Sequence, residues 1–179
     1  MTTCVTISKS LIKFFSGGRM EVVNAVYHGD LERHVDLLEL HNKLPNSKHY
    51  THKPVMVLLK EDGATMMIFG SGKFRIMGMV DELDATFKVI SVFSKIGYGF
   101  PVIKLQTMTV KFRIKPVNLT FLSKLIESQL ELELFPALLI KKYKPISVNV
   151  FSSGAVVICG VKDMDIVNVI KNDLESLYK

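Results

Sequence analysis

The chain contains one short pattern twice. Residues Ile68–Lys73 read Ile-Phe-Gly-Ser-Gly-Lys and precede Gly78, and residues 150–155 read Val-Phe-Ser-Ser-Gly-Ala and precede Gly160. The spacing from the phenylalanine to the later glycine is the same in both copies, and an aspartate opens the next segment both times. Self-similarity of this kind indicates one half-fold used twice. Such a pseudo-symmetric molecule suits a partner with approximate two-fold symmetry of its own, and duplex DNA is one.

Composition narrows the class of protein. The chain has 179 residues, 48% of them hydrophobic, which predicts a single compact domain with a buried core. A net charge of +6 permits nucleic-acid binding without requiring it. The longest apolar runs are strand-sized, so we expect no transmembrane helix, and residues 1–15 lack the features of a signal peptide. Cys4 and Cys159 are far apart, which argues against structural zinc and favours a reducing, intracellular compartment.

Hydrophobic periodicity predicts the same order of elements in both halves. In the first half we expect an amphipathic helix over Leu31–Asn42 and a second helix from Glu82 to about Ile96, capped by Asp81. The buried face of that second helix is predicted to be Leu83, Phe87, Ile90 and Phe93. The strands expected around these helices are Glu21–Tyr27, Pro54–Lys60, Ala64–Phe69 and Lys73–Val80.

The second half repeats this order after a boundary at Tyr98–Pro101. We expect helices at Asn118–Leu130 and after Asp163, the latter with Ile166, Ile170, Leu174 and Leu177 on its inner face. The expected strands are Leu105–Ile114, Ala137–Tyr143, Ser147–Phe151 and Ala155–Val161. The predicted division is an extension over 1–19 and two repeats, 20–98 and 99–179. The fold class is α+β: one continuous curved antiparallel sheet with helices on one face, leaving the other face free for function.

The motifs together resemble the core domain of the TATA-box-binding protein family. The second repeat carries Glu131–Leu138, Lys144-Pro145, Phe151–Gly154, Gly160 and Lys162 in the order of the family's signature. The first repeat carries Leu40–Asn42, Asn46–Tyr50 and Ile68–Lys73, and Gly99–Pro101 matches the segment between repeats. The resemblance covers about 20–179. It implies a saddle whose concave sheet faces the DNA minor groove and whose convex helices face protein partners.

The resemblance also assigns roles to single residues. Phenylalanines at the two stirrups of the saddle wedge between base steps and kink the duplex. These correspond to Phe135 and Phe151 in the second repeat and to Phe69 in the first. The remaining wedge position is not a phenylalanine here: Tyr50 aligns from one side and His52 from the other. By the residues alone, without the resemblance, Phe69 and Phe151 are expected to be core residues at strand ends.

Other positions depart from the family pattern. At the positions where the family hydrogen-bonds the minor groove, this sequence has Met77, Thr107 and Cys159, and Met20 aligns with the fourth position. Phosphate-contacting lysines remain at Lys73 and Lys162 but are replaced at Ala155 and Val80, and strand arginines become Leu58 and Lys141. The first half is therefore expected to be the weaker reader of DNA. The Lys141–Lys144 cluster also fits a solvated sheet edge.

The second stirrup is expected to bind protein. Glu131, Glu133 and Leu134 correspond to the surface that contacts transcription factor IIB in the family, which in turn places RNA polymerase. Alternatives are a protein-binding scaffold with little or no DNA binding of its own, and a DNA binder that needs a second subunit. Self-dimerisation through an apolar concave face is a further possibility. The expected location is the nucleus, or a cytoplasmic viral factory.

The sequence holds no sign of catalysis. It lacks a paired nucleophile and base, a glycine-rich phosphate loop and suitably spaced acids, so no enzyme activity and no cofactor are expected. The five histidines match no metal motif. Cys159 could be an ordinary buried thiol. Among the methionines, we expect Met66 and Met67 in the core and Met77 on the concave face.

Overall fold

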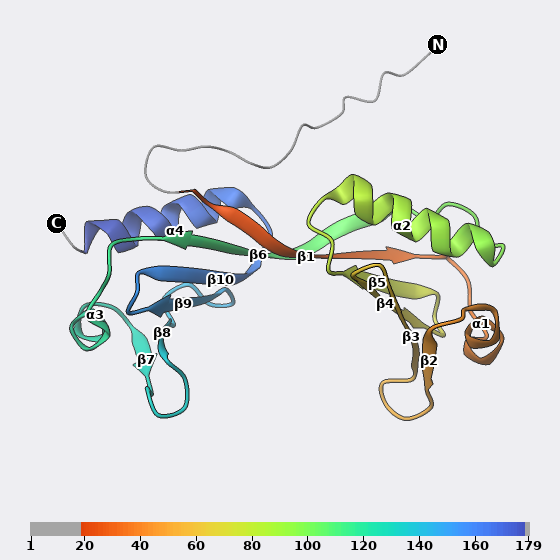
Figure 1. Ribbon diagram of the computed structural model, residues 1–179, viewed down its shortest axis with the longest axis horizontal. Helices are drawn as coiled ribbons and strands as arrows, with labels where there is room; N and C mark the ends of the chain where they lie inside the picture. The colour runs from red at the N-terminus through yellow and green to blue at the C-terminus, as the bar shows by residue number, and fades with distance from the viewer. Residues whose placement is uncertain (1–18, 178–179) are drawn as a thin grey trace, which may run out of the picture.

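The computed structural model describes residues 19–177 as one arch (Figure 1). A single ten-stranded antiparallel sheet runs from leg to leg in the order β2-β3-β4-β5-β1-β6-β10-β9-β8-β7. Helices α2 and α4 lie along the convex side of the arch, and α1 and α3 lie at its two outer ends (Figure 1). The concave side of the sheet carries no helix (Figure 1), which confirms the expected α+β saddle.

The order of elements is the same in the two halves. The first half contains β1 (Glu21–Asp30), α1 (Leu37–Lys43), β2 (Ser47–Tyr50), β3 (Met56–Glu61), β4 (Ala64–Phe69), β5 (Lys73–Met77) and α2 (Glu82–Lys95). The second contains β6 (Ile103–Arg113), α3 (Leu119–Leu125), β7 (Ser128–Leu130), β8 (Ala137–Ile140), β9 (Ser147–Phe151), β10 (Ala155–Val161) and α4 (Met164–Ser176). The halves join through β1 and β6, which pair antiparallel at the centre of the sheet.

The repeated glycines hold equivalent turns. Gly72 and Gly154 lie three residues after Phe69 and Phe151 and have φ of +86° and +79°. A side chain at Gly72 would bring its Cβ to 2.1 Å from the Arg33 carbonyl oxygen, and one at Gly154 would meet the Ile114 oxygen at 2.3 Å. Both carbonyls of these glycines accept a backbone N–H, from Leu31 and from Ile114. Only glycine combines this conformation with so close an approach, which explains the repeated pattern.

Both short helices are shorter than the periodicity predicts. The helix expected over Leu31–Asn42 begins at Leu37, because Asp36 caps it and the preceding segment pairs with the β4–β5 turn through Val35 N and Gly70 O. The helix expected over Asn118–Leu130 ends at Leu125, and residues 128–130 form edge strand β7 instead. Strand β2 is likewise missing from the strands that the sequence predicts. Edge strands this short carry too little pattern to be recognised.

The buried face of α2 differs from the expected one. Phe93 is buried, but the other core residues of this helix are Ala85, Val89 and Val92. Phe87 is 68% exposed, and Leu83 is exposed as well. The prediction places the largest apolar residues inward, whereas the neighbouring stripe of Ala85, Val89 and Val92 is the one that is buried. An apolar pair therefore lies on the convex surface.

An ionic contact fastens α4 to the second half of the sheet. The Tyr143 hydroxyl donates to Asp173 Oδ2 at 2.7 Å, and Lys142 Nζ lies 2.7 Å from the same oxygen. Hydrogen bonds from Lys142 and Tyr143 hold the pKa of Asp173 below its ordinary value of 3.8. Burial and this bond raise the pKa of Tyr143. The contact joins the β8–β9 connection to the C-terminal end of α4.

The pH dependence of folding tests this contact. A carboxyl group whose pKa is lowered in the folded state stabilises the protein fully above about pH 4 and loses that contribution as the pH falls through the folded value. Asp173→Asn should therefore destabilise the protein at pH 7 but have a much smaller effect near pH 2.5. Urea unfolding of both proteins at the two pH values measures this. An equal effect at both would show that the carboxylate charge is unimportant.

No helix within residues 19–177 is long and apolar enough to cross a membrane. In the same range, no three His, Cys, Asp or Glu side chains lie close enough together to hold a metal ion.

Candidate nucleic-acid interface

The concave face is built by strand alternation. Every second residue of each strand points away from the helices, and antiparallel register sets these residues side by side in rows across the sheet. One row crosses the first half: Lys48, Leu58, Met67, Arg75, His28 and Lys104. The equivalent row crosses the second half: Gln129, Leu139, Asn149, Val157, Lys111 and Glu21. The two rows give a residue-by-residue comparison of the halves.

The second stirrup, which comprises the connection between β7 and β8 (residues 131–136) and the adjacent end of β9, presents two phenylalanines together. The rings of Phe135 and Phe151 pack edge to face, with centroids 6.0 Å apart and an interplanar angle of 65°. Phe135 is 47% exposed. Its backbone N–H donates to the Glu131 carbonyl oxygen at 2.9 Å and so closes a tight turn. Phe151 ends β9 opposite Ala137. Exposed aromatic rings held by short turns can serve as apolar plates for stacking.

The first stirrup is built differently. Met56 pairs with Tyr50 on one side and with Phe69 on the other, so a methionine separates the two aromatic rings. Tyr50 is 42% exposed and lies on the concave face, whereas His52 lies beyond the strand in the connecting loop. Tyr50 therefore shares a cross-strand row with Phe69, one strand apart across Met56, and His52 does not. The first stirrup offers one phenylalanine, one tyrosine and a flexible thioether.

The expected minor-groove residues lie on three strands near the middle of the sheet, β5, β6 and β10. Met77 and Thr107 both pair with Val26 of β1, and Cys159 pairs with Thr109 and Ser147. Cys159 is partly exposed, so its interpretation as a buried thiol is wrong. Met67 is also on the concave face rather than in the core, because only Met66 of this adjacent pair can point inward. Met20 is buried and offers no surface contact.

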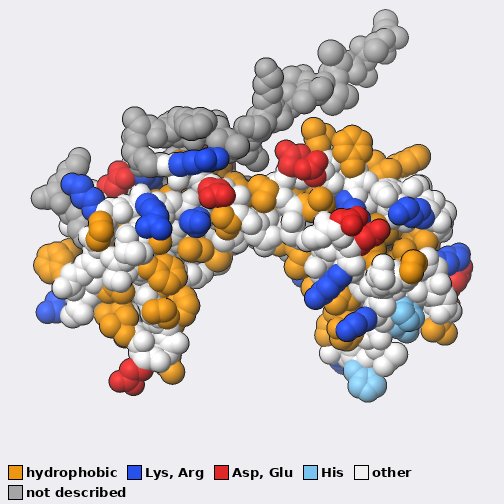
Figure 2. Space-filling model, viewed as in Figure 1, with side chains coloured by type: hydrophobic (Ala, Val, Ile, Leu, Met, Phe, Trp, Pro, Cys, Tyr) orange, Lys and Arg blue, Asp and Glu red, His pale blue; other side chains and the backbone are white. Residues whose placement is uncertain are grey.

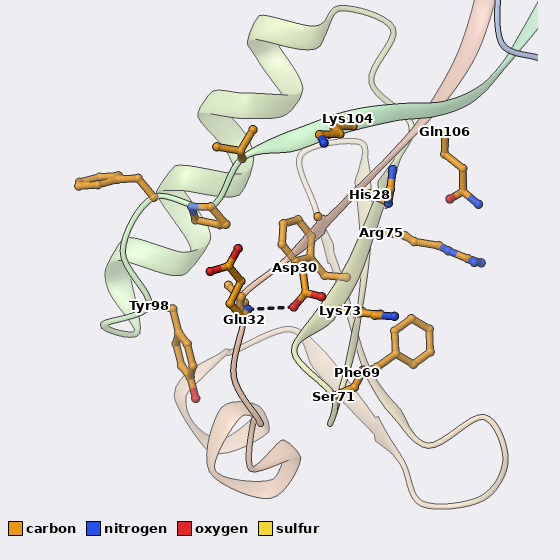
Figure 3. A pocket seen from close by; sticks show the side chains of 16 residues that line it. His28, Asp30, Glu32, Phe69, Ser71, Lys73, Arg75, Tyr98, Lys104 and Gln106 are labelled. Carbon is orange, nitrogen blue, oxygen red and sulfur yellow. Dashed lines mark hydrogen bonds between the residues drawn. The ribbon is translucent and has the colours of Figure 1, made fainter.

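Cations line the concave face more densely than we predicted. Lys73 and Arg75 project from β5 to the same side as Phe69 (Figure 3). Strand β6 adds Lys104, Lys111 and Arg113, all exposed. Sequence reasoning missed four of these, Arg75, Lys104, Lys111 and Arg113, although the alternation of charged and apolar residues in Lys73–Met77 and Lys111–Arg113 could have revealed them. A phosphate backbone would meet positive charge in both halves.

The expected phosphate contacts fall in three places. Lys73 belongs to the concave row of β5, and Lys141 follows β8 by one residue on the same alternation as Leu139. Its neighbour Lys142 turns the other way, to Asp173 on α4. Lys162 is exposed just after β10, before the cap of α4. The structure thus spreads the three lysines over both halves rather than in one patch.

A hollow of about 1010 Å³ opens between the first half and the segment joining the halves (Figure 3). Three cations line it, Lys73, Arg75 and Lys104, and so do two carboxylates, Asp30 and Glu32. The Asp30 carboxylate accepts the Glu32 N–H at 2.8 Å. Gln106 also lines it, and its buried Oε1 has no hydrogen-bond partner among the described residues. The mixed charges make this hollow less suited to an anion than the cationic rows beside it.

The tip of the second stirrup is acidic and apolar (Figure 2). Leu134 is 80% exposed there, and Glu131 and Glu133 are exposed beside it. Residues 130–134 enclose a shallow hollow of about 470 Å³. An exposed leucine between carboxylates is suited to a partner surface that is basic around an apolar recess. Its counterpart at the first stirrup carries histidine instead (Figure 2).

Comparison with known proteins agrees with this geometry. The family model described as "Transcription factor TFIID (or TATA-binding protein, TBP)" matches residues 19–96 and again 102–178. A TATA-box-binding protein of Methanococcus aeolicus is 30% identical over 88% of this chain and 95% of its own length. TATA box-binding protein-like 2 of Mus musculus is 32% identical over 83% of this chain, which spans only 46% of the mouse protein.

A solved structure shares the fold. The TBP of Methanococcus jannaschii superposes with a TM-score of 0.80 at 22% identity, covering 88% of this chain and 96% of the archaeal one. The two matches to the family model together cover nearly all of the described residues, and the archaeal structure covers a similar share of the chain.

Proposed function

Because this chain belongs to the TATA-binding protein family of transcription factors, a family of non-enzymes, we propose that it initiates transcription by bending DNA. In this proposal the concave sheet lies on the minor groove of an A·T-rich duplex. Phe135 and Phe151 enter one base step, and Phe69 with Tyr50 enters another. Lys73, Lys141 and Lys162, with Arg75, Lys104, Lys111 and Arg113, neutralise phosphates on either side.

The observation that carries the proposal is the pair Phe135–Phe151. Two large apolar rings are held against each other on the tip side of a concave sheet, outside the buried core. Burial in the protein does not explain their position. Insertion between bases would remove both rings from water and unstack the step at a cost of a few kcal/mol, which the wider contact with a bent duplex would offset.

Inosine substitution tests which groove is bound. An I·C pair presents the same minor-groove acceptors as A·T, without the guanine amino group, but a different major groove. Fluorescence anisotropy should give nearly equal affinity for an A·T-rich duplex and its I·C counterpart, and weaker affinity for G·C. Loss of binding to the I·C duplex would contradict minor-groove recognition.

We propose further that the second stirrup recruits a factor-IIB-like protein, which then places RNA polymerase. The exposed Leu134 and the carboxylates of Glu131 and Glu133 support this, because they suit a basic partner with an apolar recess. The proposed location is the nucleus, or a cytoplasmic viral factory.

A second candidate function is a protein-binding scaffold that binds DNA weakly or not at all by itself. The apolar side chains of Met67, Met77 and Leu58 on the concave face favour it, as they would favour self-association through that face. A chain that binds none of the three duplexes but still binds a factor-IIB-like protein would have this function.

Salt dependence reports how many phosphates the protein neutralises. Removing one cation that pairs with a phosphate lowers the slope of log K against log salt by about 0.9. Lys111→Ala with Arg75→Ala should therefore reduce the slope by about 1.8, since both cations lie on the concave rows. Lys95→Ala is the control, because Lys95 lies on α2 on the convex side. An unchanged slope in the double variant would remove these two residues from the interface.

A further inference from the structure

The two halves of the concave face differ at several equivalent positions, and one of these pairs lies close to the phenylalanines that end β4 and β9. Asn149 lies two residues before the wedge Phe151 on β9, and Met67 lies two residues before Phe69 on β4. The cross-strand rows confirm the equivalence, since Met67 pairs with Leu58 and Asn149 pairs with Leu139. One half thus presents a carboxamide where the other presents a thioether.

The surroundings of Asn149 give its amide no protein partner. It is flanked across the sheet by Leu139 and Val157, which are both apolar. No hydrogen bond joins its side chain to any other residue within 19–177, and it is partly exposed on the concave floor. If a bound molecule covered this amide without hydrogen-bonding it, the buried, unpaired polar groups would lower the affinity of the complex. A group of the bound molecule therefore has to pair with it.

We propose that Asn149 reads a guanine in the minor groove close to the step wedged by Phe135 and Phe151. The inference rests on the proposed DNA-binding function and names a specificity-determining residue within that site. Guanine offers an N2 amino donor and an N3 acceptor in the minor groove, whereas A·T pairs offer acceptors only. The Asn149 carbonyl can accept from N2 while its NH₂ donates to N3, so both groups of the amide are satisfied.

Met67 has the opposite effect in the first half. A thioether is only a weak acceptor and has no donor, so Met67 would leave the guanine amino group with a poor partner and N3 with none. The DNA element is therefore asymmetric: A·T-rich throughout, with one G·C pair favoured at the end under the second half and disfavoured at the mirror position. This asymmetry would set the orientation of the pseudo-symmetric protein on its site.

A positional scan on the unmodified protein tests the proposal. Single G·C pairs are placed at each position of an A·T-rich duplex, and each is compared with I·C, which lacks only the N2 amino group. At one position near the Phe135–Phe151 step, G·C should bind about 5- to 100-fold more tightly than I·C. At the mirror position G·C should bind no more tightly than I·C. Equal binding of G·C and I·C at every position would overturn the inference.

Variants assign the effect to the residue. Asn149→Met should remove the preference for G·C over I·C at that position, and Met67→Asn should create one at the mirror position. Asn172→Met is the matched control, because Asn172 is exposed on α4 and should leave the ratio unchanged. A ratio that survives Asn149→Met in a protein of native circular dichroism contradicts the assignment.

The outcomes separate this inference from the function on which it rests. If the protein binds A·T duplexes but ignores the N2 amino group, only the role of Asn149 is wrong. If it binds none of the duplexes, the DNA-binding function itself is wrong.

Discussion

Replacing Phe135 and Phe151 together by alanine should abolish DNA bending. The two rings touch each other on the concave side of the second stirrup and would enter the same base step. Loss of stacking costs about 1–3 kcal/mol for each stacked base, so the bent complex should weaken by roughly 2–6 kcal/mol, or at least about 30-fold. Fluorescence resonance energy transfer between the ends of a labelled duplex measures the bend directly.

The fold should survive this double substitution. Neither ring belongs to the buried core, so thermal unfolding should shift little. Phe121→Ala provides the control for removal of an exposed phenylalanine, because Phe121 lies on α3 and not on a concave strand. A double variant that still bends DNA to the wild-type angle would exclude Phe135 and Phe151 as wedges.

The largest expected effect on stability comes from Phe93→Ala. Phe93 is fully buried between α2 and the sheet, with its ring centroid 4.8 Å from that of Phe74 and 6.3 Å from that of Tyr98. Truncating a buried phenylalanine typically costs about 3–5 kcal/mol, because apolar packing is removed and a cavity remains. That is a large part of the roughly 5–15 kcal/mol that stabilises a domain. Urea unfolding gives the difference.

Phe87→Ala on the same helix is the matched control. Phe87 is 68% exposed, so its truncation should change the free energy of unfolding by no more than about 0.5 kcal/mol. A similar loss of stability in both variants would mean that α2 packs on the face that the periodicity predicts. This comparison therefore tests the orientation of the helix as well as the core.

The architecture could be predicted from the sequence because the same phenylalanine–glycine pattern occurs in both halves. Gly72 and Gly154 occupy equivalent turns that leave no room for a side chain, and this requirement left a visible repeat. The orientation of α2 could not be predicted in the same way. Apolar residues lie on two neighbouring stripes of that helix, and only packing against the sheet decides that Val89 and Val92 face inward.

The candidate site was predicted unevenly for a similar reason. Aromatic residues such as Phe135 stand out in a motif, whereas Arg75 and Lys111 are ordinary strand residues until register places them on one face. Asn149 gave no signal by itself. It became informative only when the rows showed that Met67 is its equivalent and that both neighbours are apolar.

The most direct test of the proposed function is the bend angle of an A·T-rich duplex bound to the unmodified protein, measured by energy transfer at two salt concentrations. We expect a sharp bend that is retained on I·C substitution and lost on a G·C duplex, and we expect the affinity to fall at higher salt. A duplex that stays straight at saturating protein concentration would contradict it.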